Sequence, residues 1–290
     1  FRGEDWEPAP SDAPVPGRVL LLGDSQMFGY GVDEEDAVAA QLAATLGDGW
    51  HVLDAAVPTW GPPEYVRALQ TWGPEYRPEV VVFVANAAND WFETKVDNSR
   101  RNTARDGWAA ARLHKMEEPS WFPFRGFFMG RSHLVFGVRE LLADRKGLPP
   151  HEAASARRLV KDLPYLMRPE GGHRSRLTPH VLAARDLCAD LGCRVVVAGL
   201  PLDVHVDEGE WAKYDGDTLS GPSFERTRGL LAVLMDEVRV HGLRAAELTM
   251  PLRAASPGAF LPDDYHLSPQ GHRAVAEALA ALVAQPHERE

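Results

Sequence analysis

Residues 18–31 read Arg-Val-Leu-Leu-Leu-Gly-Asp-Ser-Gln-Met-Phe-Gly-Tyr-Gly, and this is the most informative stretch of the chain. The apolar run at 19–22 predicts a buried strand that stops at Gly23-Asp24-Ser25. In open α/β folds, ligands bind beyond the carboxyl ends of the strands. Ser25 is therefore a candidate nucleophile, although Asp and Ser after a strand are also ordinary turn and helix-capping residues.

A second motif lies near the other end of the chain. Residues 263–272 read Asp-Asp-Tyr-His-Leu-Ser-Pro-Gln-Gly-His and lead into a helical pattern. A nucleophilic serine needs a base to take its proton and a third group to orient that base. Asp263 and His266 suit these roles, because a carboxylate three residues away in a turn reaches one imidazole nitrogen and leaves the other to face Ser25. The order Ser25, Asp263, His266 predicts a catalytic triad.

These blocks resemble those of the SGNH or GDSL-type hydrolases, whose first block is Gly-Asp-Ser and whose last is Asp-x-x-His. The family's third block, Gly-x-Asn-Asp, has its counterpart in residues 86–90, Asn-Ala-Ala-Asn-Asp, after an apolar run. The second block is matched by residues 54–59, Asp-Ala-Ala-Val-Pro-Thr. The resemblance implies an oxyanion hole formed by the N–H of Ser25, the N–H of Thr59 and the side-chain amide of Asn89.

Two glycines of the family pattern are replaced here, by Thr59 and Ala87. We therefore expect that the loop at Thr59 does not use the dihedral angles that glycine alone adopts easily. A backbone N–H survives the replacement, and the nearby Gly61 is the alternative donor.

The predicted triad also has a non-catalytic interpretation. Ser25 as a turn residue, Asp263 as a helix cap and His266 as a polar loop residue would suit a binding domain that kept the scaffold without its chemistry. Four blocks in the family's order favour the enzyme. The sequence contains no Gly-x-Ser-x-Gly elbow, phosphate-binding loop, dinucleotide fingerprint or His-Glu-x-x-His motif.

Length and composition agree with a single domain. The chain has 290 residues, of which 44% are hydrophobic and 25% charged, enough for one large core. Its net charge of −11 argues against nucleic acid as a partner, because phosphate binding needs a basic surface. No apolar stretch approaches the roughly 18 residues of a membrane span.

Residues 1–17 are acidic and contain four prolines, which predicts an extended linker before a hydrolase-like domain at 18–290. Position 1 is Phe, so we expect that an upstream signal or anchor has been removed. The expected location is periplasmic, secreted or envelope-anchored, with the cytoplasm left open, and membrane contact is expected only through the missing segment. Cys188 and Cys193 are predicted to be free thiols, and no metal-binding spacing is present.

Strand-like runs alternate with helical periodicity, which predicts a doubly wound sheet. The resemblance specifies a single-domain, flavodoxin-like, three-layer sandwich with a mostly parallel sheet of about five strands. The expected strands are 18–22, 51–53, 80–85, 194–199 and 244–247, and the expected helices include 34–46, 62–72, 181–191 and 223–241.

A long helical insertion is expected at about 91–176, after the third strand. Its aromatic segment at 121–129 suits a local core, and the alternatives are a lid over the serine or a membrane-contacting surface. Residues 203–207, Asp-Val-His-Val-Asp, are predicted to form a polar loop rather than a metal site.

The resemblance implies a serine esterase that hydrolyses an acetyl or short-acyl ester, on a carbohydrate or another alcohol, through an acyl-serine. The alternatives are an O-acyltransferase acting on a sugar hydroxyl and a non-catalytic carbohydrate-binding module. The expected partner is a small-molecule or glycan ester, without metal or organic cofactor. The sequence leaves the oligomeric state open.

Overall fold

The computed structural model of the chain describes residues 6–10, 13–94, 102–105, 108–111, 175–213, 222–262 and 264–285. Five strands form one sheet in the order β2-β1-β3-β6-β7, and every neighbouring pair is parallel. The strands are β1 (Arg18–Leu22), β2 (His51–Asp54), β3 (Val80–Asn86), β6 (Arg194–Leu200) and β7 (Arg244–Glu247). This sheet confirms the predicted α/β class and the five predicted strands.

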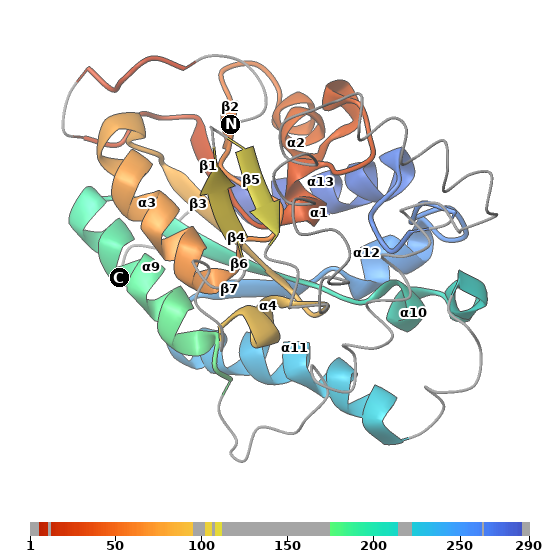
Figure 1. Ribbon diagram of the computed structural model, residues 1–290. Helices are drawn as coiled ribbons and strands as arrows, with labels where there is room; N and C mark the ends of the chain where they lie inside the picture. The colour runs from red at the N-terminus through yellow and green to blue at the C-terminus, as the bar shows by residue number, and fades with distance from the viewer. Residues whose placement is uncertain are drawn as a thin grey trace, which may run out of the picture.

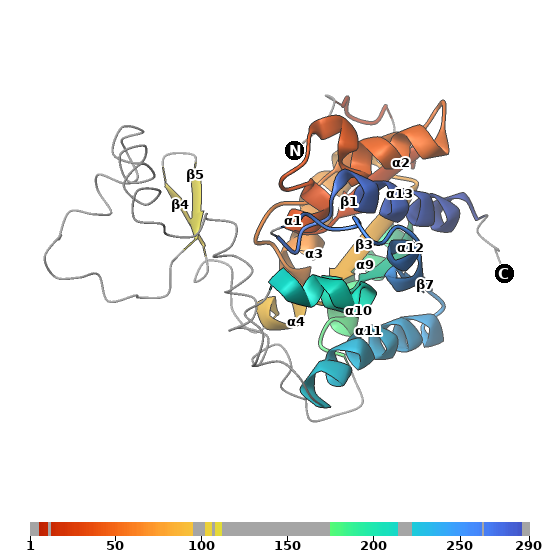
Figure 2. The ribbon, with the colours of Figure 1, turned by 90° about the vertical axis from the view of Figure 1, so that its right-hand side faces the viewer.

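Helices cover both faces of the sheet, as Figures 1 and 2 show. On one face lie α3 (Pro62–Tyr76), α9 (Thr178–Leu191) and α11 (Pro222–Val240). On the other face lie α2 (Val38–Leu46), α12 (Thr249–Ala254) and α13 (Pro269–Ala284). The result is the expected three-layer sandwich.

Side chains of each strand alternate between two hydrophobic cores. Leu20 and Leu22 pack toward α3 and α9, whereas Val19 and Leu21 pack toward α2 and α13. All seven residues of β3 are buried, as expected for a central strand of a parallel sheet with helices on both faces. The buried sheet therefore provides a rigid edge from which the functional loops emerge.

Shorter elements connect these layers. They are the short helices α1 (Ser25–Phe28), α4 (Asp90–Glu93) and α10 (Asp203–Val206), and the 3-10 helices η1 (Glu34–Asp36) and η2 (Glu208–Lys213). An antiparallel hairpin of β4 (Asn102–Arg105) and β5 (Trp108–Ala111) lies apart from the main sheet in Figure 2. The helix predicted at 34–46 is divided at Ala37, whose extended backbone separates η1 from α2.

Two sequence predictions were wrong in this part of the chain. Residues 203–206 form the short helix α10, whose four side chains are buried, instead of a polar loop. Cys188 and Cys193 form a disulfide instead of two free thiols. The reason is local: Gly192 ends α9 with a φ of 77°, and this turn brings the Cα atoms of the two cysteines within 4.7 Å.

The described part of the predicted linker runs beside the end of α3. The N–H of Ala9 donates to the carbonyl of Glu75, and the N–H of Val15 donates to the carbonyl of Arg77. Most of the predicted insertion at 91–176, including its aromatic segment at 121–129, lies outside the described residues.

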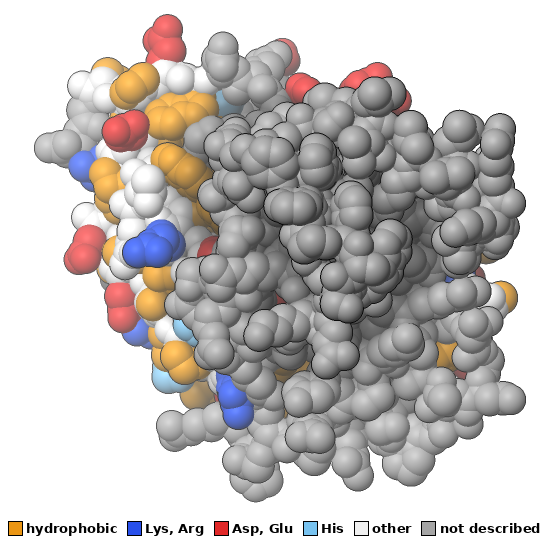
Figure 3. All heavy atoms as spheres, in the orientation of Figure 1, with side chains coloured by type: hydrophobic (Ala, Val, Ile, Leu, Met, Phe, Trp, Pro, Cys, Tyr) orange, Lys and Arg blue, Asp and Glu red, His pale blue; other side chains and the backbone are white. Residues whose placement is uncertain are grey.

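The surface formed by α3 and α9 carries acidic, basic and apolar side chains side by side (Figure 3). No helix among the described residues has both the length and the apolar character needed to cross a membrane.

Candidate active site

The carboxyl ends of β2, β1 and β3 bring three of the predicted site residues to one edge of the sheet. The chain leaves β1 toward β2 on one side and returns to β3 on the other, so β1 and β3 flank a topological switch point. Thr59, Ser25 and Asn89 follow β2, β1 and β3 in turn. Open α/β folds bind ligands at this kind of position.

Ser25 begins α1, directly after the turn that ends β1. A side chain at Gly23 would bring a Cβ within 2.4 Å of the Met27 Cγ, so glycine lets α1 fold back against the strand. Asp24 caps α1, because its Oδ1 accepts a hydrogen bond from the N–H of Gln26 at 3.0 Å. The backbone N–H of Ser25, at the first helical position, has no acceptor within the helix.

A buried hydrogen-bond network joins the loop after β1 to the loop after β3. Asp24 Oδ2 accepts from the Asn86 amide at 2.8 Å, and Asp90 Oδ2 accepts from the Asn86 N–H at 2.7 Å. The Tyr65 hydroxyl donates to Asp90 Oδ1 at 3.1 Å. Burial, with the charges of Asp90 and other nearby carboxylates, raises the pKa of Tyr65, which remains a donor. Asp24 and Asp90 therefore fix the loops that follow β1 and β3.

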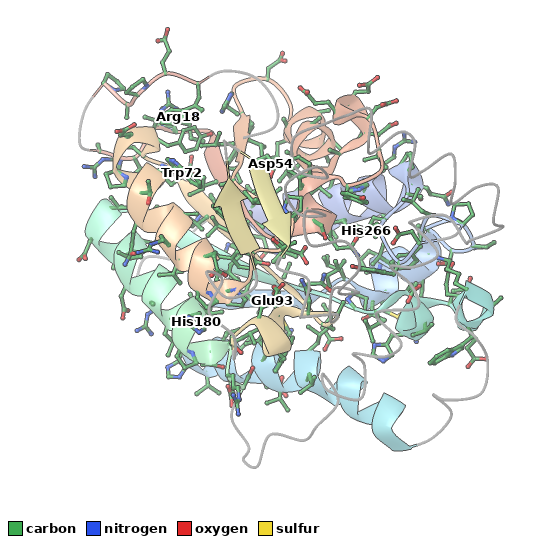
Figure 4. The ribbon with its side chains drawn as sticks, viewed as in Figure 1. Arg18, Asp54, Trp72, Glu93, His180 and His266 are labelled. Atoms are coloured by element: carbon green, nitrogen blue, oxygen red, sulfur yellow. A yellow bond between two sulfur atoms is a disulfide. The ribbon has the colours of Figure 1, made fainter. Side chains whose placement is uncertain are left out.

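The imidazole of His266 connects the Ser25 hydroxyl to a carboxylate. Its Nε2 lies 2.9 Å from the Oγ of Ser25, and its Nδ1 lies 2.8 Å from the Oδ1 of Asp264. His266 and Asp264 are both buried, with 5% and 4% of their surfaces exposed. Figure 4 shows His266 in the loop that precedes α13. This arrangement can move a proton from the serine to the histidine.

The carboxylate that orients His266 belongs to Asp264, so the assignment of this role to Asp263 was wrong. Asp264 Oδ1 accepts from both the backbone N–H of His266, at 3.2 Å, and the ring. A spacing of two residues allows this double contact in a tight turn, as in an Asx-turn. Asp263 itself lies outside the described residues.

Asp264 is adapted to stay ionised. Burial raises the pKa of its carboxyl, but hydrogen bonds and the charge of His266 together outweigh burial, so the pKa lies below the ordinary 3.8. An ionised Asp264 holds the Nδ1 proton on His266 and leaves Nε2 free to accept the proton of Ser25.

Two tyrosine rings flank the imidazole. The Tyr265 ring stacks on the His266 ring with centroids 4.4 Å apart, and the Tyr30 ring lies 4.8 Å from it. Burial is the main cause that raises the pKa of Tyr265. Tyr30 is 42% exposed, so it presents part of its ring to solvent beside His266.

Thr59 adopts the backbone conformation that the sequence analysis excluded. Its φ is 73°, in the left-handed region that favours glycine. Pro58 precedes it, and the N–H of Trp60 donates to the carbonyl of Val57 at 3.1 Å. A proline followed by a residue with positive φ, closed by this hydrogen bond, is the pattern of a type II turn. The prediction failed because the turn, closed between β2 and α3, imposes the conformation on a β-branched residue.

Gly61 and Asn89 differ in how their polar groups are used. The Gly61 N–H donates to Glu64 Oε2 at 3.0 Å, and Glu93 of α4, labelled in Figure 4, packs against Gly61. Gly61 is therefore a poor alternative to Thr59 as an oxyanion donor. Within the described part of the chain, the Asn89 Oδ1 accepts no hydrogen bond.

Three residues at this site were missed by the sequence analysis: Gln26, Tyr30 and Lys213. Gln26 and Tyr30 follow the Gly-Asp-Ser block closely, which is the only signal that the sequence carries for them. Lys213 reaches the site from η2 and has no such signal. Across the residues that the structure describes, no group of three or more His, Cys, Asp or Glu side chains is placed to hold a metal ion.

No protein-family model and no curated protein matches this chain. Solved structures do, at low identity. A protein described as lipolytic and of the G-D-S-L family, from Desulfitobacterium hafniense, is 12% identical with a TM-score of 0.49, covering 92% of this chain and 99% of that one. A member of the same family from Veillonella parvula is 12% identical with a TM-score of 0.48, and the match covers 92% of this chain and 99% of that one. A carbohydrate acetylesterase from Sinorhizobium meliloti is 13% identical with a TM-score of 0.43, and the match covers 92% of this chain and 98% of that one.

Proposed function

We propose that this chain is a serine esterase of the SGNH/GDSL type, which hydrolyses a carboxylic ester through an acyl-serine intermediate. One observation carries the proposal: the continuous hydrogen-bonded series from Ser25 Oγ through His266 to Asp264. Serine, histidine and an ionised carboxylate in this geometry are what nucleophilic acyl transfer requires.

In the first half-reaction, His266 Nε2 takes the proton of Ser25 as the Oγ attacks the ester carbonyl. Asp264 stabilises the resulting imidazolium without taking its proton. The tetrahedral oxyanion is held by the N–H groups of Ser25 and Thr59 and by the amide of Asn89, and each donor contributes about 3 kcal/mol to the transition state. His266 then returns the proton to the leaving alkoxide, and the alcohol departs.

In the second half-reaction, His266 takes a proton from water as the water oxygen attacks the acyl-serine. A second oxyanion forms and collapses, the proton returns to Ser25 Oγ, and the carboxylic acid is released. Each residue therefore regains its starting protonation state.

The substrate that we propose is an acetyl or short-acyl ester of a carbohydrate. His266 Nε2 protonates the leaving oxygen, so the alcohol part of the substrate must lie beside the His266 ring. Tyr30 packs against that ring and exposes 42% of its surface. An aromatic face suits the apolar face of a sugar ring.

We propose an exported or envelope-anchored location. The Cys188–Cys193 disulfide supports it, because disulfides persist mainly in oxidising compartments.

The test is hydrolysis of p-nitrophenyl acetate, butyrate and octanoate by the parent and by Ser25→Ala, with intact mass measured after exposure to a fluorophosphonate. Turnover and a single phosphonyl adduct, both lost in Ser25→Ala, are expected. Labelling without turnover points to a transferase that awaits a sugar acceptor. Neither labelling nor turnover overturns the proposal and favours a binding module.

The sugar preference is tested separately with Tyr30→Ala and Tyr30→Phe on an acetylated methyl xyloside and on ethyl acetate. Loss of a stacking ring should lower kcat/KM about ten-fold on the xyloside alone, and Tyr30→Phe should retain it. Equal losses on both esters would indicate that Tyr30 acts on His266 instead of on the alcohol.

A further inference from the structure

The side chain of Gln26 forms hydrogen bonds with the backbone on both sides of His266. Its Nε2 donates to the carbonyl of Tyr265 at 3.1 Å, and its Oε1 accepts from the N–H of Leu267 at 3.0 Å. The Gln26 side chain is buried, with the residue 3% exposed. One planar amide therefore contacts the residue before the histidine and the residue after it.

These two hydrogen bonds satisfy backbone groups of the loop that carries His266, here called the histidine loop. The adjacent backbone groups are satisfied elsewhere: the carbonyl of His266 accepts from the N–H of Leu261 at 2.9 Å, and the carbonyl of Asp264 accepts from Lys213. Leu267 also pairs with Phe260 in an isolated antiparallel bridge. Replacing Gln26 by an apolar residue would leave a buried donor and a buried acceptor of the loop without this partner.

Gln26 also follows Ser25 directly in α1. The short helix that carries the nucleophile therefore carries the contact to the base, although 241 residues separate Ser25 from His266. A shift of α1 would move Oγ and the His266 backbone together and preserve the 2.9 Å contact between Oγ and Nε2.

We infer that Gln26 is a positioning residue, which couples the base to the nucleophile through the backbone of the His266 loop. The inference rests on the proposed function, since it assigns to Gln26 the alignment of the Ser25–His266 pair. A displacement of about 1 Å in a reacting group can lower a rate about 100-fold, so loss of the Gln26 hydrogen bonds should lower the rate by about this factor.

The test compares Gln26→Met, which keeps the length of the side chain and removes both hydrogen bonds, with the parent chain. We expect kcat on p-nitrophenyl acetate and the rate of fluorophosphonate labelling to fall about 100-fold, while KM changes less than about two-fold. The NMR resonance of the His266 Nδ1 proton should shift or broaden. Gln41→Met is the matched control, because the Gln41 side-chain amide donates to the Glu35 carbonyl in an exposed position.

A second variant covers the case in which Gln26→Met does not fold. Gln26→Glu keeps the acceptor for Leu267 and loses the donor to Tyr265, and we expect at least a ten-fold fall in kcat. A folded Gln26→Met with parental kcat, labelling rate and Nδ1 resonance would overturn the inference. So would a lower melting temperature with unchanged kcat, since Gln26 would then only stabilise the fold.

The failure of the proposed function has a different signature. A parent chain that neither hydrolyses esters nor reacts with the fluorophosphonate contradicts the esterase proposal whatever Gln26 does. In that case the Nδ1 resonance still decides the inference, because it reports the position of His266 relative to Asp264 without any turnover.

Discussion

The ammonium group of Lys213 donates a hydrogen bond to the backbone carbonyl of Asp264, and the two atoms are 2.8 Å apart. Lys213 also forms ion pairs with Glu210 and, at 3.7 Å, with Asp203. Its side chain is 9% exposed and that of Asp203 is fully buried. The loop that orients His266 is thereby tied to the segment that follows β6.

Substitution of this lysine should destabilise the fold. Lys213→Met removes the ion pair between Lys213 and the buried carboxylate of Asp203, and we expect the free energy of unfolding to fall by about 3 kcal/mol. Urea unfolding of the variant and the parent measures this. Lys213→Met combined with Asp203→Asn should recover part of the loss, because both charges of the pair are then removed. An unchanged stability in Lys213→Met would contradict the ion pair.

The two adjacent aspartates should differ strongly in their effect on activity. Asp264→Asn removes the negative charge and replaces one acceptor oxygen by an NH2 donor, so the His266 tautomer is no longer fixed and kcat for p-nitrophenyl acetate should fall about 10⁴-fold. Asp263→Asn should stay within about three-fold of the parent, as for a residue outside the triad. The pair is compared by steady-state kinetics at one pH. The reverse order of effects would restore Asp263 to the triad.

The depressed pKa of Asp264 predicts a specific acid sensitivity. A carboxyl whose pKa is lower in the folded state stabilises the fold above its unfolded pKa of 3.8, and this contribution is lost as pH falls through the folded-state pKa. Urea unfolding of the parent and Asp264→Asn between about pH 2.5 and 5 should show a difference in stability that shrinks with acid. A difference that is independent of pH would contradict the shift.

Replacing Thr59 by glycine should make the folded chain more stable. Its φ of 73° strains a β-branched residue, and relief of about 1–3 kcal/mol outweighs the roughly 0.4–1 kcal/mol that glycine loses through the unfolded state. Thr59→Gly should raise the free energy of unfolding by about 1 kcal/mol, while Thr59→Ala, which keeps a Cβ, should gain less. Activity should persist in both because the N–H remains. A lower free energy of unfolding in Thr59→Gly would indicate that contacts of the threonine side chain stabilise the fold by more than the backbone strain destabilises it.

Asn89 should matter for catalysis and little for folding. Asn89→Ala removes one proposed oxyanion donor, and kcat should fall about 10²–10³-fold. Because no described residue donates to its Oδ1, the free energy of unfolding should change by less than about 0.5 kcal/mol. Kinetics and urea unfolding of the same preparation check both parts. Parental kcat in the variant would remove Asn89 from the oxyanion hole.

Much of the site could be predicted from the sequence because strand-ending motifs keep their positions in a parallel sheet. Ser25 follows an apolar run that the structure contains as β1, and Asn89 follows one that it contains as β3. The alternation of such runs with helical segments predicted a parallel sheet, and the carboxyl ends of parallel strands meet at one edge, where both residues lie. The position of the Tyr30 ring beside His266 could not be predicted in this way, because no hydrophobic run or motif specifies it.

Hydrophobic periodicity and local blocks of residues were enough to predict the alternation of strands and helices and to select Ser25 and His266 as the candidate nucleophile and base. They could not predict which of two adjacent aspartates faces the imidazole, that Thr59 takes a left-handed conformation, or that Gln26 and Lys213 bond to the histidine loop. These depend on how separate segments pack against one another, and one residue of register in a tight turn is enough to exchange Asp263 for Asp264.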